Sequence, residues 1–333
     1  MKVLRAFGRN DLRVVEAPIP DPGPGYVRIK VRASGICGSD KWLWNVGGEV
    51  RMVIGHEVAG DVDAVGEGVR SLAAGDRVMV NNVVGCGECA YCRAGSFVLC
   101  PRWDGKDDVN NGFGEYLAAP ARNCVRLLPG LDYVDGALIM DNWGTPYGAI
   151  RRAGIEGGMD VLVNGCGPIG QASVALLASM GVCALAVDPI EGRREAALRG
   201  GARAAFTPDE LPAAAHKATG GAGVHAAFDC SGKGASYGNL LRSLKCEGTL
   251  VTIGEEAECT LKPSEQLIRR ALTIMGTWYS TIPHATEVMH LAAQGRIDVR
   301  SSLTHTVTLE EAARMYGSIV NCEEGIIKCV IVF

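Results

Sequence analysis

The chain has 333 residues, of which 47% are hydrophobic and 21% are charged, as in ordinary globular proteins. Its net charge of −4 argues against a general attraction to nucleic acid or to anionic membrane surfaces. No apolar run is long enough to span a bilayer, and the first residues lack the apolar core of a secretion signal. We therefore expect a cytoplasmic protein with no nucleic-acid or membrane partner.

The first part of the chain predicts an irregular, mainly antiparallel β-structure. Residues 26–32 alternate apolar and polar side chains after a turn-forming cluster at 21–25, as a half-buried strand does. Segments 56–65 and 76–80 predict further short strands. We interpret Gly35 in this region as a turn former.

The pattern changes near residue 145, where strands and helices begin to alternate. Strands are expected at 160–164, 184–188, 225–229, 248–253 and 272–275, with helices at 168–180 and from 193 onward. Such alternation predicts an α/β fold with a doubly wound parallel sheet. A helix around 284–294 and an apolar strand at 326–333 are expected to follow.

Four closely spaced cysteines form the sharpest motif, Cys86-x2-Cys89-x2-Cys92-x7-Cys100. Four thiolates at this spacing can surround one zinc ion tetrahedrally and leave no open position, so the site should be structural. Two disulfides, free thiols or an iron–sulfur cluster are the alternatives.

Cys37, His56 and Glu57 could form a second metal site. Thiolate, imidazole and carboxylate groups all bind zinc. Each residue alone is unremarkable, because a lone cysteine is usually packed in a core and a lone histidine is usually hydrogen-bonded filler.

A glycine-rich turn follows the expected strand at 160–164 and opens the next helix. Its residues are Gly165, Gly167, Pro168, Ile169 and Gly170. Glycines in this context let a pyrophosphate approach the helix N-terminus. Asp188, at the end of the next strand, suits the ribose hydroxyls of NAD, although Arg193 and Arg194 leave NADP open. Alternatively, Asp188 only caps the following helix.

The order and spacing of these motifs resemble those of zinc-containing medium-chain dehydrogenases/reductases. The resemblance covers nearly the whole chain. It includes Gly35-Ile-Cys-Gly-Ser-Asp40, Gly55-His-Glu57, Val65-Gly-Glu-Gly-Val69, Gly75-Asp-Arg-Val78, the four-cysteine motif, Gly112-Phe-Gly-Glu-Tyr116 and Gly165-Cys-Gly-Pro-Ile-Gly170. It implies a mainly β, GroES-like catalytic domain (1–141 and 280–333) and a Rossmann dinucleotide-binding domain (142–279). It also implies that Lys328 approaches the cofactor phosphates.

By the same resemblance, Cys37 and His56 bind a catalytic zinc, and Glu57 is a nearby or alternating ligand. Asp40 would orient His56. The third ligand in the family is Cys or Glu, and the matching position here is Asp141. The alternative is that Asp141 only caps a turn before the helix.

Ser39 matches the hydroxyl group that relays a proton in this family. Many relatives have a histidine three residues later, where this chain has Trp42. The usual exit for the proton therefore looks absent, and Lys41, a water chain or a substrate group would have to replace it. Alternatively, Ser39 only caps the turn after Cys37.

These features predict an enzyme that uses NAD and two zinc ions per subunit to oxidise a small-molecule alcohol. We expect hydride transfer from a secondary hydroxyl of a sugar, cyclitol or polyol, because tryptophans lie beside amides and carboxylates. Trp42 and Asn142 are the substrate candidates, with Trp44 and Trp143 near them. The alternatives are a simple secondary or aromatic alcohol dehydrogenase and a non-catalytic NAD(H)-binding structural or sensor protein. The family suggests a homodimer or homotetramer.

Overall fold

The computed structural model describes residues 1–255, 258–321, 323 and 325–333. These divide into two compact units, one formed by Met1–Gly144 with Ser280–Phe333 and the other by Thr145–Tyr279. Within the described part of the chain, no helix is long and apolar enough to cross a membrane.

The first unit is built on a mixed, largely antiparallel sheet with strand order β14-β15-β3-β4-β5-β7, and β6 pairs with β3. Its strands are β1 (Lys2–Gly8), β2 (Asp11–Glu16), β3 (Tyr26–Ile36), β4 (Glu57–Val65), β5 (Arg77–Val80), β6 (Tyr116–Pro120), β7 (Cys124–Arg126), β14 (Leu303–Val307) and β15 (Lys328–Val332). Its helices are α1 (Lys41–Asn45), α2 (Ala90–Arg93), α3 (Tyr133–Leu138), the π-helix η4 (Ile139–Trp143), α10 (Ile282–Ala293) and α11 (Leu309–Val320).

Strand β3 organises this unit, because it pairs with β4, β6 and β15. The expected alternation is confirmed, since Val27, Ile29 and Val31 are buried and lie in one core cluster. Strand β15 runs antiparallel to β3 and pairs Cys329 with Ile36. The end of the chain is thereby brought beside the loop that carries Cys37.

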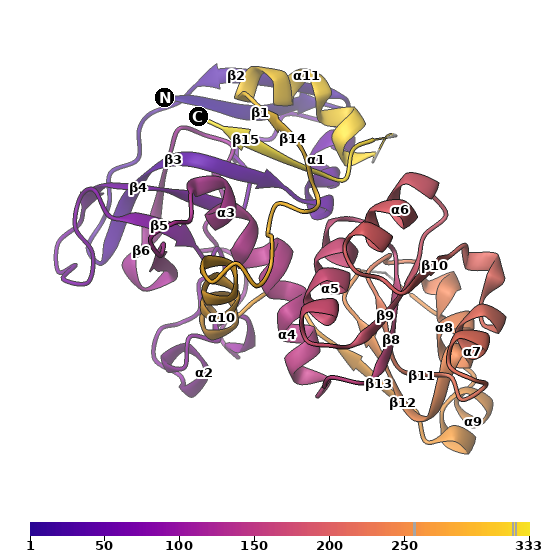
Figure 1. Ribbon diagram of the computed structural model, residues 1–333. Coiled ribbons are helices and arrows are strands. Elements are labelled where there is room, and N and C mark those ends of the chain that lie inside the picture. The colour runs from indigo at the N-terminus through magenta and orange to yellow at the C-terminus, as the bar shows by residue number, and fades with distance from the viewer. Residues whose placement is uncertain (256–257, 322, 324) are drawn as a thin grey trace. The chain divides into compact units, whose positions relative to one another are not determined.

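Two elements of this unit were not expected from the sequence. The hairpin of β1 and β2 packs against α11, so the two ends of the chain lie together (Figure 1). Helix α11 follows a capping box in which Thr308 accepts from the backbone of Glu311, and the Glu311 carboxylate accepts from Thr308. That Thr-x-x-Glu signal is readable in the sequence.

The second unit confirms the expected doubly wound α/β fold. Its six-stranded sheet has the order β10-β9-β8-β11-β12-β13, and all pairs are parallel. Its strands are β8 (Asp160–Asn164), β9 (Cys183–Val187), β10 (Ala204–Phe206), β11 (Val224–Asp229), β12 (Leu244–Thr252) and β13 (Thr273–Gly276). Its helices are α4 (Gly144–Arg152), α5 (Pro168–Ser179), α6 (Glu191–Arg199), α7 (Ala213–Ala218), α8 (Tyr237–Ser243) and α9 (Pro263–Gln266).

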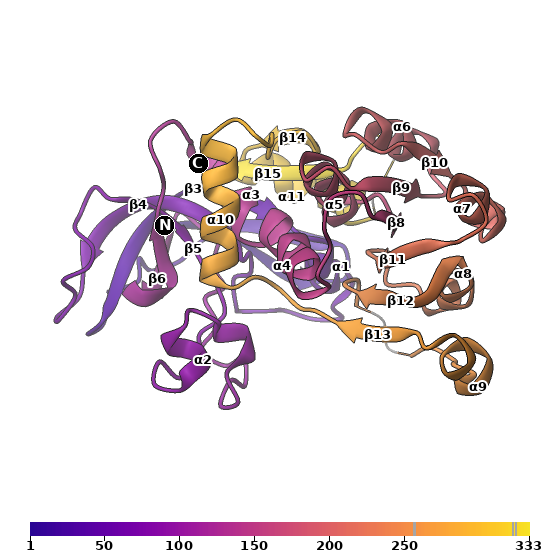
Figure 2. The ribbon, with the colours of Figure 1, turned by 60° about the horizontal axis from the view of Figure 1, so that its bottom comes forward.

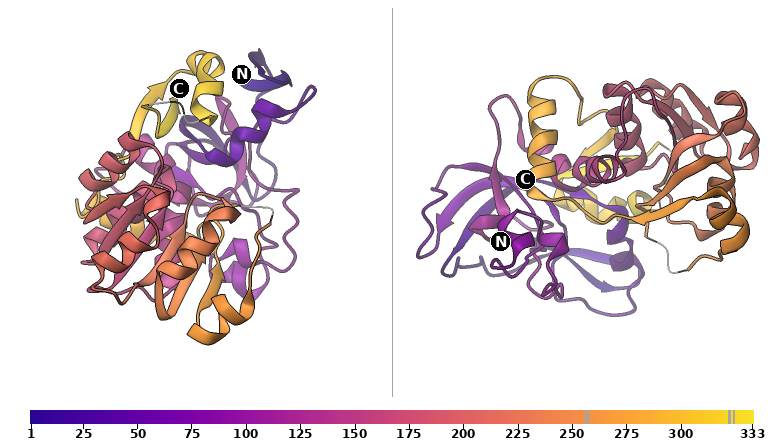
Figure 3. Two further views of the ribbon diagram at one scale, coloured as in Figure 1. Left: turned by 90° about the vertical axis from the view of Figure 1, so that its right-hand side faces the viewer. Right: turned by 90° about the horizontal axis from the view of Figure 1, so that it is seen from below.

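Helices lie on either side of this sheet (Figure 3), and β13 forms one edge (Figure 2). The strand order reverses between β8 and β11, and ligands of such sheets bind at the carboxyl ends of the strands where this happens. Buried aliphatic residues such as Leu162, Leu185 and Leu250 fill the core against α8.

Candidate functional site

The loop after β3 presents Cys37 and Ser39. Cys37 is the N-cap of a 3₁₀ turn over Gly38–Asp40, and its backbone N–H donates to Asp40 Oδ2 at 2.9 Å. The buried Tyr316 of α11 donates from its hydroxyl to the Asp40 carbonyl at 3.2 Å, which anchors this turn to the carboxyl-terminal helix. Ser39 is exposed on the turn.

The structure brings the predicted ligands together, as ligand atoms of Cys37, His56, Glu57 and Asp141 all lie within 4.8 Å of one another. His56 Nε2 lies 3.1 Å from Asp141 Oδ2, and His56 Nδ1 lies 3.4 Å from Asp40 Oδ1. Cys37 Sγ lies 3.8 Å from Asp141 Oδ2. Burial lowers the pKa of His56, but Asp40 and Asp141 outweigh burial and raise that pKa well above its usual value.

Asp141 lies in the π-helix η4, which interrupts the helical segment between α3 and α4. The capping box of Asp132 and Asp135 begins that segment at α3. π-Helical turns are rare and frequently occur at functional sites. Asp141 is in the first turn of η4, whose N-cap is Leu138, and its carboxylate is buried beside the other three predicted ligands, so the structure gives no support to a capping role.

Glu57 forms a buried ion pair with Lys328, in which Nζ and Oε1 are 2.6 Å apart and both side chains are 1% exposed. The ammonium also donates to the Ile36 carbonyl at 2.9 Å. Burial raises the pKa of Glu57, and the Lys328 ammonium opposes that increase. For Lys328 to reach cofactor phosphates, its ammonium would have to leave Glu57.

The interpretation of Gly35 as a turn former is wrong. Gly35 lies in β3 without a positive φ, and a Cβ there would clash with the Glu57 carboxylate. Glycine is needed to leave room for that buried side chain. Glu57 Oε2 is buried without a hydrogen-bond partner. An unsatisfied carboxylate oxygen beside a thiol, an imidazole and a second carboxylate is a donor set that suits zinc.

The four-cysteine motif forms one compact cluster, with its ligand atoms also within 4.8 Å of one another. All its cysteines are free, so the structure does not contain the alternative pair of disulfides. The backbone N–H groups of Glu88 and Cys89 lower the pKa of Cys86 to about 6, whereas burial raises the pKa of Cys92 to about 12. These sulfurs fit a closed tetrahedral metal site.

The glycine-rich turn connects β8 to α5 and depends on its glycines. Gly165 has a φ of +88°, and its Cβ would lie 2.9 Å from the Ser231 backbone. A Cβ on Gly170 would clash with the Gly165 carbonyl. Gly167 is the N-cap of α5, whose first residue is Pro168. The backbone N–H groups at this helix start are therefore available to an anion.

Asp188 follows β9 and is 3% exposed. Its Oδ2 accepts from the Cys166 N–H at 2.7 Å and its Oδ1 accepts from the Ile190 N–H at 2.8 Å, so it ties the glycine-rich turn to the start of α6. Arg193 lies in the first turn of α6, and its carbonyl accepts from the Gln171 side chain.

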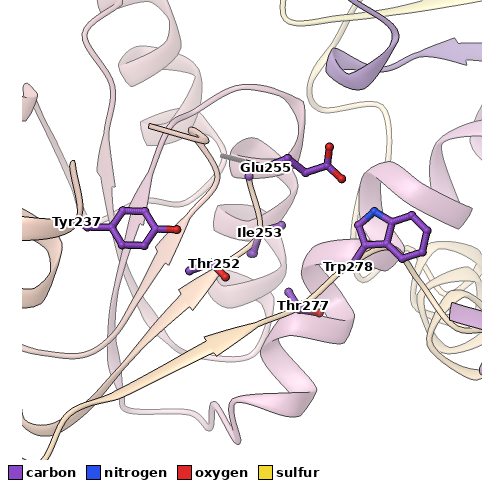
Figure 4. Close-up of a pocket in the computed structure, with 7 residues that line it drawn as sticks. Tyr237, Thr252, Ile253, Glu255, Thr277 and Trp278 are labelled. Atoms are coloured by element: carbon purple, nitrogen blue, oxygen red, sulfur yellow. The ribbon is translucent and has the colours of Figure 1, made fainter. Parts of the chain in front are cut away.

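A pocket of about 410 Å³ opens at the carboxyl ends of β12 and β13 (Figure 4). Tyr237 points toward it from the start of α8, and Trp278 lies across it after β13. The lining residues are Tyr237, Thr252, Ile253, Gly254, Glu255, Thr277 and Trp278. Sequence reasoning missed this pocket, because its sides come from three separate segments.

The tryptophans near the predicted substrate site have different environments. Trp143 is fully buried and donates to the Val299 carbonyl, so it cannot serve as a substrate platform. For Trp143 the substrate interpretation is therefore wrong, because its indole belongs to the core. Trp44 is half-buried and packs against Tyr316. Trp42 is 45% exposed, and Asn142 is buried with both amide atoms lacking a hydrogen-bond partner.

Two protein-family models match the chain. Alcohol dehydrogenase GroES-like domain matches residues 23–129, and zinc-binding dehydrogenase matches residues 168–294. A zinc-type alcohol dehydrogenase-like protein of Escherichia coli is 31% identical over 98% of this chain and 97% of its own length. Sorbitol dehydrogenase 2 of Saccharomyces cerevisiae is 26% identical over 96% of this chain and 95% of its own.

Solved structures of similar proteins carry nicotinamide cofactors. An alcohol dehydrogenase of Escherichia coli CFT073 complexed with NADH has a TM-score of 0.89 and 27% identity, covering 100% of this chain and 99% of that one. A zinc-binding dehydrogenase of Sinorhizobium meliloti bound to NADP has a TM-score of 0.87 and 25% identity, with the same coverage.

Proposed function

The chain belongs to the zinc-dependent medium-chain dehydrogenase family, and from this premise we propose that it oxidises a secondary hydroxyl of a sugar, cyclitol or polyol with NAD. As a member, it is a zinc- and NAD(P)-dependent alcohol dehydrogenase. The observation that carries the proposal is the cluster of Cys37, His56, Glu57 and Asp141, which mixes soft and hard ligands at one place.

Cys37, His56 and Asp141 would hold the catalytic zinc, with Glu57 as a nearby or alternating ligand held by Lys328. Zinc bound there supplies a Lewis acid that lowers the pKa of the substrate hydroxyl. Asp40 would keep the His56 ring oriented through Nδ1, so that Nε2 could bind the zinc. The second zinc would be structural and held by Cys86, Cys89, Cys92 and Cys100.

Ser39 is proposed to accept the substrate proton, since it is exposed on the turn that carries Cys37. Trp42 has no group that could pass this proton on, because its indole nitrogen only donates. The proton would then leave through a water chain or a substrate group. Lys41 is exposed on the first turn of α1, but its ammonium group only donates, so it could not take up this proton.

The cofactor would bind along the carboxyl edge of the second unit's sheet. Its pyrophosphate suits the turn formed by Gly165, Gly167, Pro168, Ile169 and Gly170, and its adenosine ribose suits Asp188 and Arg193. Since the fold consists of two mononucleotide-binding halves, the pocket after β12 and β13 suits the nicotinamide half. NAD is favoured over NADP because Asp188 would repel a 2′-phosphate.

Two observations support a polyhydroxylated substrate. Asn142 is not one of them, because its amide is fully buried next to Asp141. Two relatives from Saccharomyces cerevisiae are named sorbitol dehydrogenase. Trp42 offers an exposed apolar face on which a sugar or cyclitol ring could stack.

The two compact units are proposed to be the expected catalytic and dinucleotide-binding domains. Strand β13 is an edge strand of the second unit and the place where two subunits would pair into a homodimer or a homotetramer. Mass photometry of the purified protein would measure the number of subunits.

A screen for NADH formation tests the proposed reaction, using polyols, cyclitols, sugars and simple secondary and aromatic alcohols at equal concentration. We expect kcat/KM to be highest for a compound with neighbouring hydroxyls and to fall when NADP replaces NAD. Preference for a simple alcohol would favour the first alternative. Zinc-loaded protein that binds NADH but oxidises none of these compounds would favour the non-catalytic alternative.

A further inference from the structure

A buried polar network connects the carboxyl ends of three neighbouring strands in the second unit. Asn164 ends β8 and donates from Nδ2 to Asp229 Oδ1 at 2.9 Å and to Ser231 Oγ at 3.0 Å. Ser231 donates to the same Asp229 oxygen from its hydroxyl at 2.6 Å and from its backbone N–H at 3.1 Å. One carboxylate oxygen therefore links β8 to the loop that follows β11.

The backbone of Asp229 extends this network to β12. Its carbonyl accepts from the N–H groups of Ile253 and Gly254, at 2.9 and 2.8 Å. Both of these residues line the pocket at the carboxyl ends of β12 and β13 (Figure 4). Asp229 is thus joined on one side to the strand that leads into the glycine-rich turn and on the other to a wall of the pocket.

The loops around Asp229 are packed backbone to backbone. A Cβ on Gly165 would lie 2.9 Å from the Ser231 backbone, and a Cβ on Gly254 would clash with the Gly232 backbone. A small displacement of one loop must therefore move the next, because no flexible side chain separates them.

A buried carboxylate such as that of Asp229 lowers folding stability, so packing alone does not explain why an aspartate is present. Asp229 is fully buried, and its Oδ2 has no hydrogen-bond partner. An unsatisfied buried oxygen reduces stability, whereas the negative charge strengthens each hydrogen bond that Oδ1 accepts. The gain is a rigid junction at the point where the strand order reverses.

We propose that Asp229 is a positioning residue for the dinucleotide, which fixes the glycine-rich turn and the pocket relative to each other through β8, β11 and β12. This inference rests on the proposed NAD chemistry and assigns Asp229 no contact with the cofactor. It identifies the Asn164–Asp229–Ser231 network as the element that makes the binding edge rigid before the cofactor arrives.

The test is a fluorescence titration of the zinc-loaded protein with NADH. It measures the dissociation constant separately from the number of competent sites, which are the chains that can bind NADH. Asp229→Asn keeps the shape but loses the charge, and we expect it to weaken NADH binding about tenfold. Ser231→Ala is a milder change that removes one donor to Oδ1 and one acceptor of Asn164, and it should weaken binding about threefold. Asp160→Asn is the matched control at the opposite end of β8, and its NADH affinity should match the wild type.

The variants also distinguish positioning from simple stability. A dissociation constant equal to the wild type, with only a lower melting temperature or fewer competent sites, would overturn the proposal for Asp229. If Asp229→Asn does not fold, unchanged affinity in Ser231→Ala and Asn164→Ala would overturn it. Wild-type protein that binds neither NADH nor NADPH would overturn the proposed function as well.

Discussion

The two candidate metal-binding clusters of the first unit differ in how the chain assembles them. The four cysteines come from one segment, 86–100, and are surrounded by its own backbone N–H groups. The other cluster draws Cys37, His56 and Asp141 from separate segments and is backed by Lys328 from the last strand. A cluster formed within one segment can stabilise that segment when it binds metal. In a cluster assembled from separate segments, neighbouring residues such as Lys328 can adjust the charge around the metal ligands.

The largest expected effect is a loss of activity when a residue of the Cys37–His56–Glu57–Asp141 cluster is replaced. We call this cluster the mixed cluster. Asp141→Ala removes one of its proposed zinc ligands and should lower kcat/KM about a thousandfold, because the zinc would supply several kcal/mol of charge stabilisation in the transition state. Asp11→Ala, which breaks an ion pair with Arg13 on the hairpin, is the control and should keep wild-type activity. Normal turnover in Asp141→Ala would remove Asp141 from the site.

The second effect should appear in stability. Cys92→Ser disrupts the four-cysteine cluster, and at free zinc a thousandfold above its Kd the lost binding costs about 4 kcal/mol. Urea denaturation with zinc analysis measures this loss, and Cys246→Ser is the control at an exposed cysteine. Full zinc content in Cys92→Ser would contradict a closed four-sulfur site.

The third prediction concerns the support of the mixed cluster. Lys328→Met leaves the Glu57 carboxylate buried without its cation, which should cost about 3 kcal/mol in the free energy of unfolding. The double variant Lys328→Met/Glu57→Gln should recover most of that loss, because the uncompensated charge is gone. Additive losses in the double variant would show that the two side chains do not form a pair in solution.

The smallest effect is a difference in pH dependence. In the zinc-free protein, the pKa of His56 is raised above its usual 6.5, because Asp40 and Asp141 outweigh burial. Protonated His56 therefore stabilises the zinc-free fold fully below pH 6.5, and this contribution disappears as the pH rises through the raised pKa.

Zinc must displace the proton of His56 before it can bind there. As long as the pH is below the raised pKa of His56, loss of this one proton should increase zinc affinity at the mixed cluster about tenfold per pH unit. Competition with a chromophoric chelator, in wild type and in Cys92→Ser, would measure it. An affinity that is flat between pH 6 and pH 8 would contradict the raised pKa.

The sequence predicted what depends on local spacing. The four-cysteine motif, the glycine-rich turn after β8 and the alternation of strands and helices are readable because their residues are neighbours in the chain. The role of Gly35 and the Glu57–Lys328 pair were not predicted, since Gly35 meets Glu57 where β3 pairs with β4, and Lys328 reaches Glu57 from β15. The π-helix that carries Asp141 has no sequence signal that we recognise. Helix α11 could have been predicted from its capping box.

Anomalous diffraction at the zinc edge, from crystals of the purified protein, tests the central claim most directly. We expect two zinc peaks per chain, one among the four cysteine sulfurs and one bound by Cys37, His56 and Asp141. A single peak among the four cysteines, in protein that turns over its alcohol substrate at the full rate, would contradict it.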